Sequence, residues 1–213
     1  MLKVPFGGLS EPQRLDCLNW PVWPYKPSVE FRIGYDDAGI HLEWTVDEQT
    51  IRAKQGMPGG EVYEDSCVEF FFKPSADDPH YYNFEWNAIG NLCVSWRTGR
   101  FDPEPAPASV YELVQADASC GFVPFDERQA KGPWTLKVFI PVKALWHGLG
   151  DNGQTAEGAP CSLRGLQARA NFYKCGDGLT VPHFVTWAPI ATEKPDYHRP
   201  EFFADLQFVP END

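Results

Sequence analysis

The sequence predicts an all-β protein: a single β-sandwich of about ten antiparallel strands with one short helix, of the immunoglobulin-like or DOMON-like, jelly-roll-like kind. Apolar and polar residues alternate over short segments, which is the period of a half-buried strand. The 20 Pro and 18 Gly interrupt these segments at short intervals, and helical periodicity is poor throughout. Many short strands with few helices are typical of a sandwich. The 213 residues, 43% of them hydrophobic, suit one domain over 1–213 with its core at about 20–208.

The strands follow one another with short connections. In 29–35 (VEFRIGY) and 40–47 (IHLEWTVD) every second residue is apolar, and the DDAG between them predicts a hairpin turn. Segment 67–73 (CVEFFFK) is nearly all apolar, which suits a central strand. The short helix is expected at 142–149, after Pro141. The other predicted strands are 81–88, 91–97, 110–116, 134–141, 166–173, 183–187 and 204–209.

Two long loops separate these strands. Segment 49–64 contains GMPGGEVYED, and segment 101–109 (FDPEPAPAS) is expected to be extended and rigid because of its prolines. Loops of this length in compact domains are often binding loops.

The net charge of −12 and the pI of about 4.8 indicate an acidic surface. Such a surface disfavours nucleic acids and anionic membranes, and leaves neutral ligands and cations as partners. No apolar run approaches the roughly 18 residues of a membrane span, and MLKVPFGGLSEP lacks the apolar centre of a signal peptide. We expect a cytoplasmic protein if Met1 is the natural start, and a secreted or periplasmic one if the natural chain begins earlier. The oligomeric state stays open.

The six cysteines predict free, buried thiols rather than a disulfide framework. They form no CxxC pair and show no zinc-ligand spacing. Cys67 and Cys93 lie within strand-like segments, where cysteine behaves as a small hydrophobic residue. The cysteines stand at positions 17, 67, 93, 120, 161 and 175.

Two predicted strands have an unusually polar face. In YYNFEWNA (81–88) one face carries Tyr, Phe, Trp and Ala, and the other carries Asn83, Glu85 and Asn87. In LQARANFY (166–173) the polar face includes Arg169 and Asn171. Amides, carboxylates and guanidinium groups hydrogen-bond well to sugar hydroxyls, and an aromatic ring covers the apolar face of a pyranose. The alternative is an ordinary solvated sheet face on which Arg and Glu pair with each other.

Five runs of the sequence resemble carbohydrate-binding module family 9, especially its stand-alone bacterial branch. The similarity extends over about 20–208. It implies a DOMON-like β-sandwich with structural calcium that binds glucan or xylan chain ends, or small sugars, without catalysis, in polysaccharide catabolism. The runs are EDSCVEFFF (64–72), YYNFEWNAIG (81–90), RANFYKCGD (169–177), HFVTWAPI (183–190) and PDYHRPEFFADLQF (195–208).

The resemblance also implies site residues. Tyr63 and Trp187 match the two aromatic rings that clamp the sugar in this family. Tyr63 stands where Trp is common, and Glu85 stands where an Arg contacts sugar in characterised members. Asp77-Asp78 is the nearest match to the family's acidic calcium loops, and no other cofactor is implied. The polar contacts match Glu85, Asn87, Arg169 and Asn171, with Lys174 at the rim.

Two other functions stay open beside the binding of a mono- or oligosaccharide. One is an accessory or interaction protein that keeps the sandwich without binding sugar, which would suit a cytoplasmic location. The other is a small glycoside hydrolase, or an isomerase, that acts on sugars through Asp65, Glu69 or Glu85. Asp65 is better explained as a loop cap or a cation ligand.

Metal and haem sites are weaker hypotheses. Cys175, His183 and His198 could gather around a metal, although such loose spacing is more often structural. A haem-binding DOMON domain would need axial Met and His ligands, and apart from Met1 the chain offers only Met57, in a Gly-rich loop.

Overall fold

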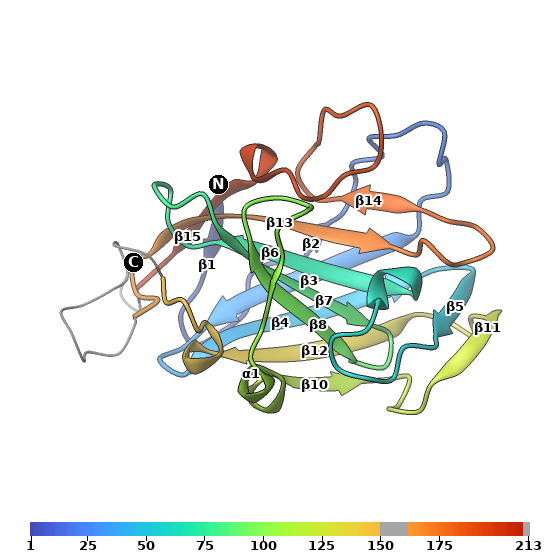
Figure 1. The fold of residues 1–213 in the computed structure, drawn as a ribbon, viewed down its shortest axis with the longest axis horizontal. Coiled ribbons are helices and arrows are strands. Elements are labelled where there is room, and N and C mark those ends of the chain that lie inside the picture. Colours follow the sequence, from blue (N-terminus) through green and yellow to red (C-terminus); the bar gives the residue numbers. More distant parts are fainter. Residues whose placement is uncertain (150–161, 211–213) are drawn as a thin grey trace.

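The computed structural model describes residues 1–149 and 162–210, and in it two β-sheets pack face to face (Figure 1). The main sheet has the order β1-β15-β13-β6-β7-β8-β9, with β14 also paired to β13. The second sheet has the order β10-β12-β4-β3-β2, and β11 pairs with β5 in a separate ribbon. The all-β sandwich predicted from the sequence is thereby confirmed.

The bounds of the elements are as follows. The main sheet contains β1 (Leu2–Val4), β6 (Cys67–Lys73), β7 (Tyr81–Asn87), β8 (Leu92–Arg97), β9 (Glu104–Pro105), β13 (Gln167–Cys175), β14 (Phe184–Thr186) and β15 (Ala204–Phe208). The second sheet and the ribbon contain β2 (Gln13–Arg14), β3 (Ser28–Tyr35), β4 (Gly39–Asp47), β5 (Thr50–Ala53), β10 (Gln115–Ala118), β11 (Phe125–Gln129) and β12 (Trp134–Pro141). The helical elements are α1 (Ala108–Leu113) and the 3₁₀ turns η1 (Val62–Glu64), η2 (Val142–Ala144) and η3 (Pro200–Phe202).

Fifteen strands lie in the described residues, more than the ten predicted. The strands missed were β1, β2, β5, β9 and β11, each of two to five residues. Strand pairing is antiparallel as predicted except at one edge, where β1 runs parallel to β15 with Leu2 opposite Leu206. The central position predicted for 67–73 is correct, since β6 lies between β13 and β7.

Two local predictions were wrong. Segment 110–116 was predicted to be a strand, but α1 covers its first half and begins after Pro107. Proline suits a helix start because it has a fixed φ and no N–H to satisfy. Val110 and Val114 are four residues apart, a spacing that fits one helix turn, and the Val114 N–H bonds to the Val110 carbonyl. The helix predicted at 142–149 is only the 3₁₀ turn η2, followed by a turn that closes at Gly148 with φ +73°.

The main core lies between the two sheets and is rich in aromatic rings. Phe31 of the second sheet stacks on Phe172 of the main sheet at 3.7 Å between ring centroids, and Phe70 lies 5.0 Å from Phe172. Trp86 belongs to this core, as its position on the apolar face of its strand predicted. Five cysteines are free thiols, and Cys161 lies outside the described residues.

The outer face of the main sheet is also covered. A second apolar cluster joins outward-facing residues of β6, β7 and β13 to loops near residues 20 and 190–203. Every residue of β6 and of β7 is consequently buried. Among the described residues no helix has the length and apolar character of a membrane span. The extent of the domain, 1–213, stays a prediction.

Candidate functional site

A cavity of about 290 Å³ lies on the outer face of the main sheet. Strand residues of β6, β7, β8, β13 and β14 reach it, and residues of the connecting segments surround it. The strands contribute Glu69, Glu85, Cys93, Arg97, Cys175 and Phe184. The remaining lining residues are Tyr63, Arg100, Asp177, Pro195, Asp196, Tyr197 and His198.

A larger hollow, of about 500 Å³, lies on the outer face of the second sheet. Its acidic and basic side chains, among them His41, Glu43 and Lys137, are partly or fully exposed. Glu43 and Lys137 already pair with each other at 3.2 Å. The cavity on the main sheet holds buried carboxyl groups instead, and we therefore take it as the candidate site.

Two buried carboxyl groups face each other across β6 and β7. Glu69 lies directly opposite Glu85 in the ladder, and the two residues are 3% and 7% exposed. Burial raises the pKa of both groups, and the charge of Glu85 raises the pKa of Glu69 further. A protonated carboxyl group both donates and accepts hydrogen bonds, as a sugar hydroxyl does.

Each carboxyl group also has a protein partner. Asn83 Nδ2 donates to Glu85 Oε1 at 2.7 Å, and the Cys175 thiol donates to Glu69 Oε1 at 3.1 Å. These bonds hold both side chains against the sheet, so that the carboxyl groups form a fixed polar surface.

Arg97 supplies hydrogen-bond donors on the β8 side of the cavity. Its Nε donates to Ser95 Oγ at 2.9 Å, and its Nη1 lies 3.3 Å from both ring nitrogens of His198. Tyr81 Oη lies 3.0 Å from His198 Nδ1. Burial, with Arg97 and then Arg100 close by, lowers the pKa of His198 to about 3, so the ring is neutral at physiological pH.

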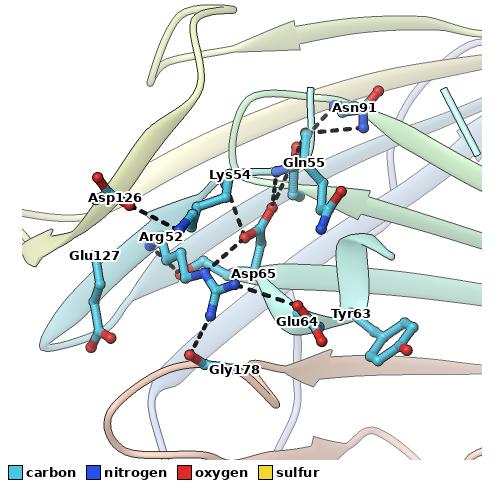
Figure 2. A network of polar contacts seen from close by, with 12 residues as sticks. Arg52, Lys54, Gln55, Tyr63, Glu64, Asp65, Asn91, Asp126, Glu127 and Gly178 are labelled. Atoms are coloured by element: carbon cyan, nitrogen blue, oxygen red, sulfur yellow. Dashed lines mark hydrogen bonds and ion pairs between the residues drawn. The ribbon is translucent and has the colours of Figure 1, made fainter. Parts of the chain in front are cut away.

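Tyr63 lies in η1 at the rim of the cavity and is 38% exposed. Its hydroxyl donates to Glu61 Oε1 at 3.0 Å. Figure 2 shows the ring pointing away from the polar network beneath η1. The exposed ring face is available to a ligand, and the hydroxyl is already paired.

The network beneath η1 is centred on Asp65, which is fully buried (Figure 2). Its carboxylate accepts the backbone N–H groups of Lys54 and Gln55 at 3.0 and 2.9 Å. Asn87 Nδ2 donates to it at 2.9 Å, and Arg52 Nε pairs with it at 3.3 Å. Asp65 thus anchors the 52–65 loop, as expected of a loop cap, and does not reach the cavity.

Among the predicted site residues, only Tyr63 and Glu85 line this cavity. The two asparagines instead tie loops to the sheet. Asn87 Nδ2 donates to the Gln55 carbonyl at 2.8 Å as well as to Asp65. Asn171 bonds to both backbone groups of Ala188. Both amides are fully buried and bonded within the protein.

Arg169 and Lys174 also lie away from the cavity. Lys174 has the parity of the core residues in β13, and it pairs with the buried Glu48 at 2.9 Å and lies 2.7 Å from His183. Arg169 bonds to the Phe203 carbonyl and lies 3.6 Å from Asp205. The rim position predicted for Lys174 is therefore corrected: its ammonium group is fully buried.

The structure does not bring Tyr63 and Trp187 together. Trp187 packs edge-on against Phe31 and Phe172, at 6.0 and 5.5 Å between ring centroids. Its ring thus contacts the main core between the sheets, whereas Tyr63 lies on the outer face of the main sheet. A tryptophan just beyond a three-residue strand gives no periodic signal of which face it will occupy.

Sequence reasoning missed most of the cavity. Arg97 could have been found, because the alternation of NLCVSWR places Cys93, Ser95 and Arg97 on one face of β8. Phe184 is in the predicted strand 183–187, but nothing local predicts which strand it pairs with, and His198 comes from a loop remote in sequence. The proposed group of Cys175, His183 and His198 is not assembled, since His183 contacts Lys174 and His198 contacts Arg97.

The chain is thus a β-sandwich with a cavity on one sheet face that is lined by aromatic and polar side chains. Residues 9–208 match the family described as carbohydrate-binding family 9, and the chain belongs to that family. Its boundary is thus earlier than the predicted residue 20. Among proteins with curated functions, none is significantly similar to this chain.

Solved structures agree with this assignment. One is a protein from Bacteroides uniformis ATCC 8492 to which carbohydrate binding has been ascribed. It is 39% identical with a TM-score of 0.84, over 93% of this chain and 86% of that one. Two family 9 modules of Caldicellulosiruptor kristjanssonii, in complex with cellotriose and with glucose, are 9% and 8% identical with TM-scores of 0.54 and 0.57. They cover all of this chain, and it covers 95% and 96% of theirs, which shows the shared fold.

Proposed function

We propose that this protein binds a mono- or oligosaccharide of the glucan or xylan type in the cavity on the main sheet, without catalysis. The observation that carries the proposal is the pair of buried carboxyl groups of Glu69 and Glu85 beside Arg97, below an aromatic rim. Membership of a carbohydrate-binding family supports it. Two structures of similar fold support it as well, since they are complexes with cellotriose and with glucose.

The cavity offers the groups that a sugar needs. Glu85 and Arg97 supply acceptors and donors for hydroxyl groups, and the rings of Tyr63 and Phe184 offer apolar surface for the C–H face of a pyranose. A volume of about 290 Å³ is at the small end of ligand sites, which run from roughly 300 to 1,000 Å³. This size favours one or two sugar rings over a longer stretch of chain.

The placement of the carboxyl groups favours binding over hydrolysis. A glycosidase needs two carboxyl groups that flank the scissile bond, one as acid and one as base or nucleophile. Glu69 and Glu85 stand side by side on adjacent strands in the floor of the cavity, and Glu69 accepts a hydrogen bond from the Cys175 thiol. The pair therefore lies on one side of a bound sugar instead of on both sides of a glycosidic bond.

Structural calcium stays a prediction, as does the location of the protein in the cell. At the Asp77-Asp78 pair, Asp78 Oδ1 accepts the backbone N–H of His80 and lies 2.6 Å from its Nδ1. A local turn accounts for these contacts.

The proposal is tested by isothermal titration calorimetry with glucose, xylose, cellobiose, xylobiose and their longer oligomers. We expect saturable binding of one sugar class. Glu85→Ala should weaken it about tenfold, because leaving a buried hydrogen-bond partner unsatisfied costs about 1–3 kcal/mol. The matched control is Glu43→Ala, a glutamate on the outer face of the second sheet, which should bind as the wild type does.

A second variant separates the cavity from the clamp that the family resemblance implied. Trp187→Ala should keep its sugar affinity and lose stability, since the ring packs on Phe31 and Phe172. Binding that is lost in Trp187→Ala but kept in Glu85→Ala would place the site elsewhere. No binding of any sugar by the wild type would favour the accessory-protein function.

A further inference from the structure

Two thiols and a carboxyl group meet beneath the cavity. Cys67 and Cys175 are directly opposite each other in the antiparallel ladder of β6 and β13. Glu69 is two residues after Cys67 and therefore on the same face of β6. One sulfur or oxygen atom from each of the three side chains lies within 4.8 Å of the other two, and all three residues are buried.

A hydrogen bond joins two members of this group, and a bound cation would replace the thiol proton that makes it. The Cys175 thiol donates to Glu69 Oε1 at 3.1 Å. Cys175 Sγ also lies 3.5 Å from the Tyr63 carbonyl, and Cys67 Sγ lies 3.8 Å from the Val68 carbonyl. The soft ligand atoms thus face one point from two strands of a rigid sheet, which holds them in place before any ion binds.

We propose that Cys67, Cys175 and Glu69 form a binding site for a thiophilic divalent cation of the Zn²⁺ type. A tetrahedral zinc ion binds sulfur at about 2.3 Å and carboxylate oxygen at about 2.0–2.2 Å, which places ligand atoms roughly 3.5–3.8 Å apart. The 4.8 Å limit of this group requires only small side-chain rotations to reach that spacing. Thiolate ligands select zinc-like ions over calcium and magnesium, which prefer oxygen.

The cavity gives an ion a way in. Glu69 and Cys175 line it, while Cys67 lies below them with no exposed surface. Three protein ligands leave a fourth tetrahedral position for water or a ligand atom. Two thiolates and one carboxylate carry three negative charges, so a bound divalent ion leaves a net charge of −1, and Arg97 on the same cavity offsets it.

Local sequence patterns do not indicate this site, since its ligands come from CVE at 67–69 and from Cys175 more than a hundred residues later. The inference does not depend on sugar binding. It concerns the floor of the same cavity.

The test is a titration of the reduced protein with Co²⁺, followed by absorption spectroscopy. We expect one equivalent to produce a thiolate-to-cobalt charge-transfer band and the visible bands of a tetrahedral site. Zn²⁺ should abolish these bands, and Ca²⁺ and Mg²⁺ should leave them. Cys67→Ser and Cys175→Ser should each lose the charge-transfer intensity. Cys17→Ser and Cys120→Ser, which change partly exposed thiols elsewhere, should keep it.

Folding is checked separately, because Cys67 and Cys175 are buried. Circular dichroism of each metal-free variant shows whether it is folded. Glu69→Gln keeps both thiols and the shape of the side chain, and should weaken Co²⁺ binding by about tenfold or more, as the loss of groups around a metal does.

Several results would overturn the proposal. They are the absence of a thiolate band in the reduced wild type, a band that persists in both Cys67→Ser and Cys175→Ser, or a Cys67–Cys175 disulfide whose reduction restores no cobalt binding. Sugar binding is measured by calorimetry on metal-free protein. Loss of one signal with the other intact therefore shows which of the two proposals fails.

Discussion

The two faces of the main sheet are both buried, yet they are built differently. The inner face packs rings against the second sheet, with Phe172 in contact with Phe31 and Phe70. The outer face carries amides, carboxyl groups and thiols under a cover of loops. Strands β6 and β7 are thus buried throughout, although their outer faces mix Phe71 and Tyr81 with polar groups.

The difference shows that burial alone does not identify a binding residue. Asn87 and Asn171 bond to loop backbone and hold the cover in place. Glu69 and Glu85 have partners on the strands themselves and face the cavity. The partner of each polar group, rather than its exposure, separates structural residues from candidate ligand contacts.

The largest effect is expected from Phe172→Ala, on the inner face of the main sheet, which tests whether the two faces act independently. It should lower the free energy of unfolding by about 4 kcal/mol, as Phe→Ala changes in well-packed cores do. Sugar affinity of the folded variant should stay the same, because the ring faces away from the cavity. Urea denaturation gives the first quantity and calorimetry the second. A large change in affinity at constant stability would contradict the assignment of faces.

A smaller effect is expected from Glu69→Gln, on the outer face. Burial raises the pKa of Glu69 in the folded protein above its ordinary value of 4.5, so unfolding releases a proton at pH values between the two. The free energy of unfolding of the wild type therefore falls as the pH rises from about 4.5 through the raised pKa.

Glutamine cannot ionise, so the variant loses this pH dependence. Glu69→Gln should equal the wild type in stability at pH 4. At pH 8 it should be more stable than the wild type, because ionisation of the buried Glu69 destabilises the folded wild type there and cannot occur in the variant. Urea denaturation at both pH values checks the prediction. Equal destabilisation at both would mean that Glu69 is ionised and paired in the folded protein.

The smallest effect concerns the rim. Tyr63→Ala should weaken sugar binding by about 0.5–1.5 kcal/mol, roughly two- to twelvefold, through lost ring contact. Tyr63→Phe should bind as the wild type does, since the hydroxyl is paired with Glu61. Both variants should unfold near the wild-type midpoint because the side chain is partly exposed. Equal losses in both would assign the contact to the hydroxyl.

The sequence predicts which residues share a face of a strand, but it does not predict which of them line the cavity. A period of two residues separates Asn83, Glu85 and Asn87 from the core whatever the tertiary structure, so that prediction was correct. Which of them meets a ligand depends on loops far away in the chain. Asn87 donates a hydrogen bond to Asp65 beneath the loop, whereas Glu85 and His198 line the same cavity.

Trp187 shows that a family resemblance also leaves the face occupied by a side chain undetermined. A family resemblance assigns it a role by position, but a ring beyond the end of β14 can turn to either face. In this chain it completes the core against Phe172. Helix α1 was missed for a related reason, since a six-residue segment fits a strand or a helix equally well until its neighbours are known.

The alternation along β13 has a consequence for how this protein can change during evolution. Phe172 and Lys174 face the second sheet, whereas Tyr173 and Cys175 are on the outer face, where Cys175 lines the cavity. Inserting or deleting one residue in this strand would move each set of side chains to the opposite face of the sheet. Polar residues would then enter the core between the sheets, and core residues would face the cavity side. Variation in length is thereby confined to the loops over the cavity, and new ligand preferences can arise there while the strands keep their lengths.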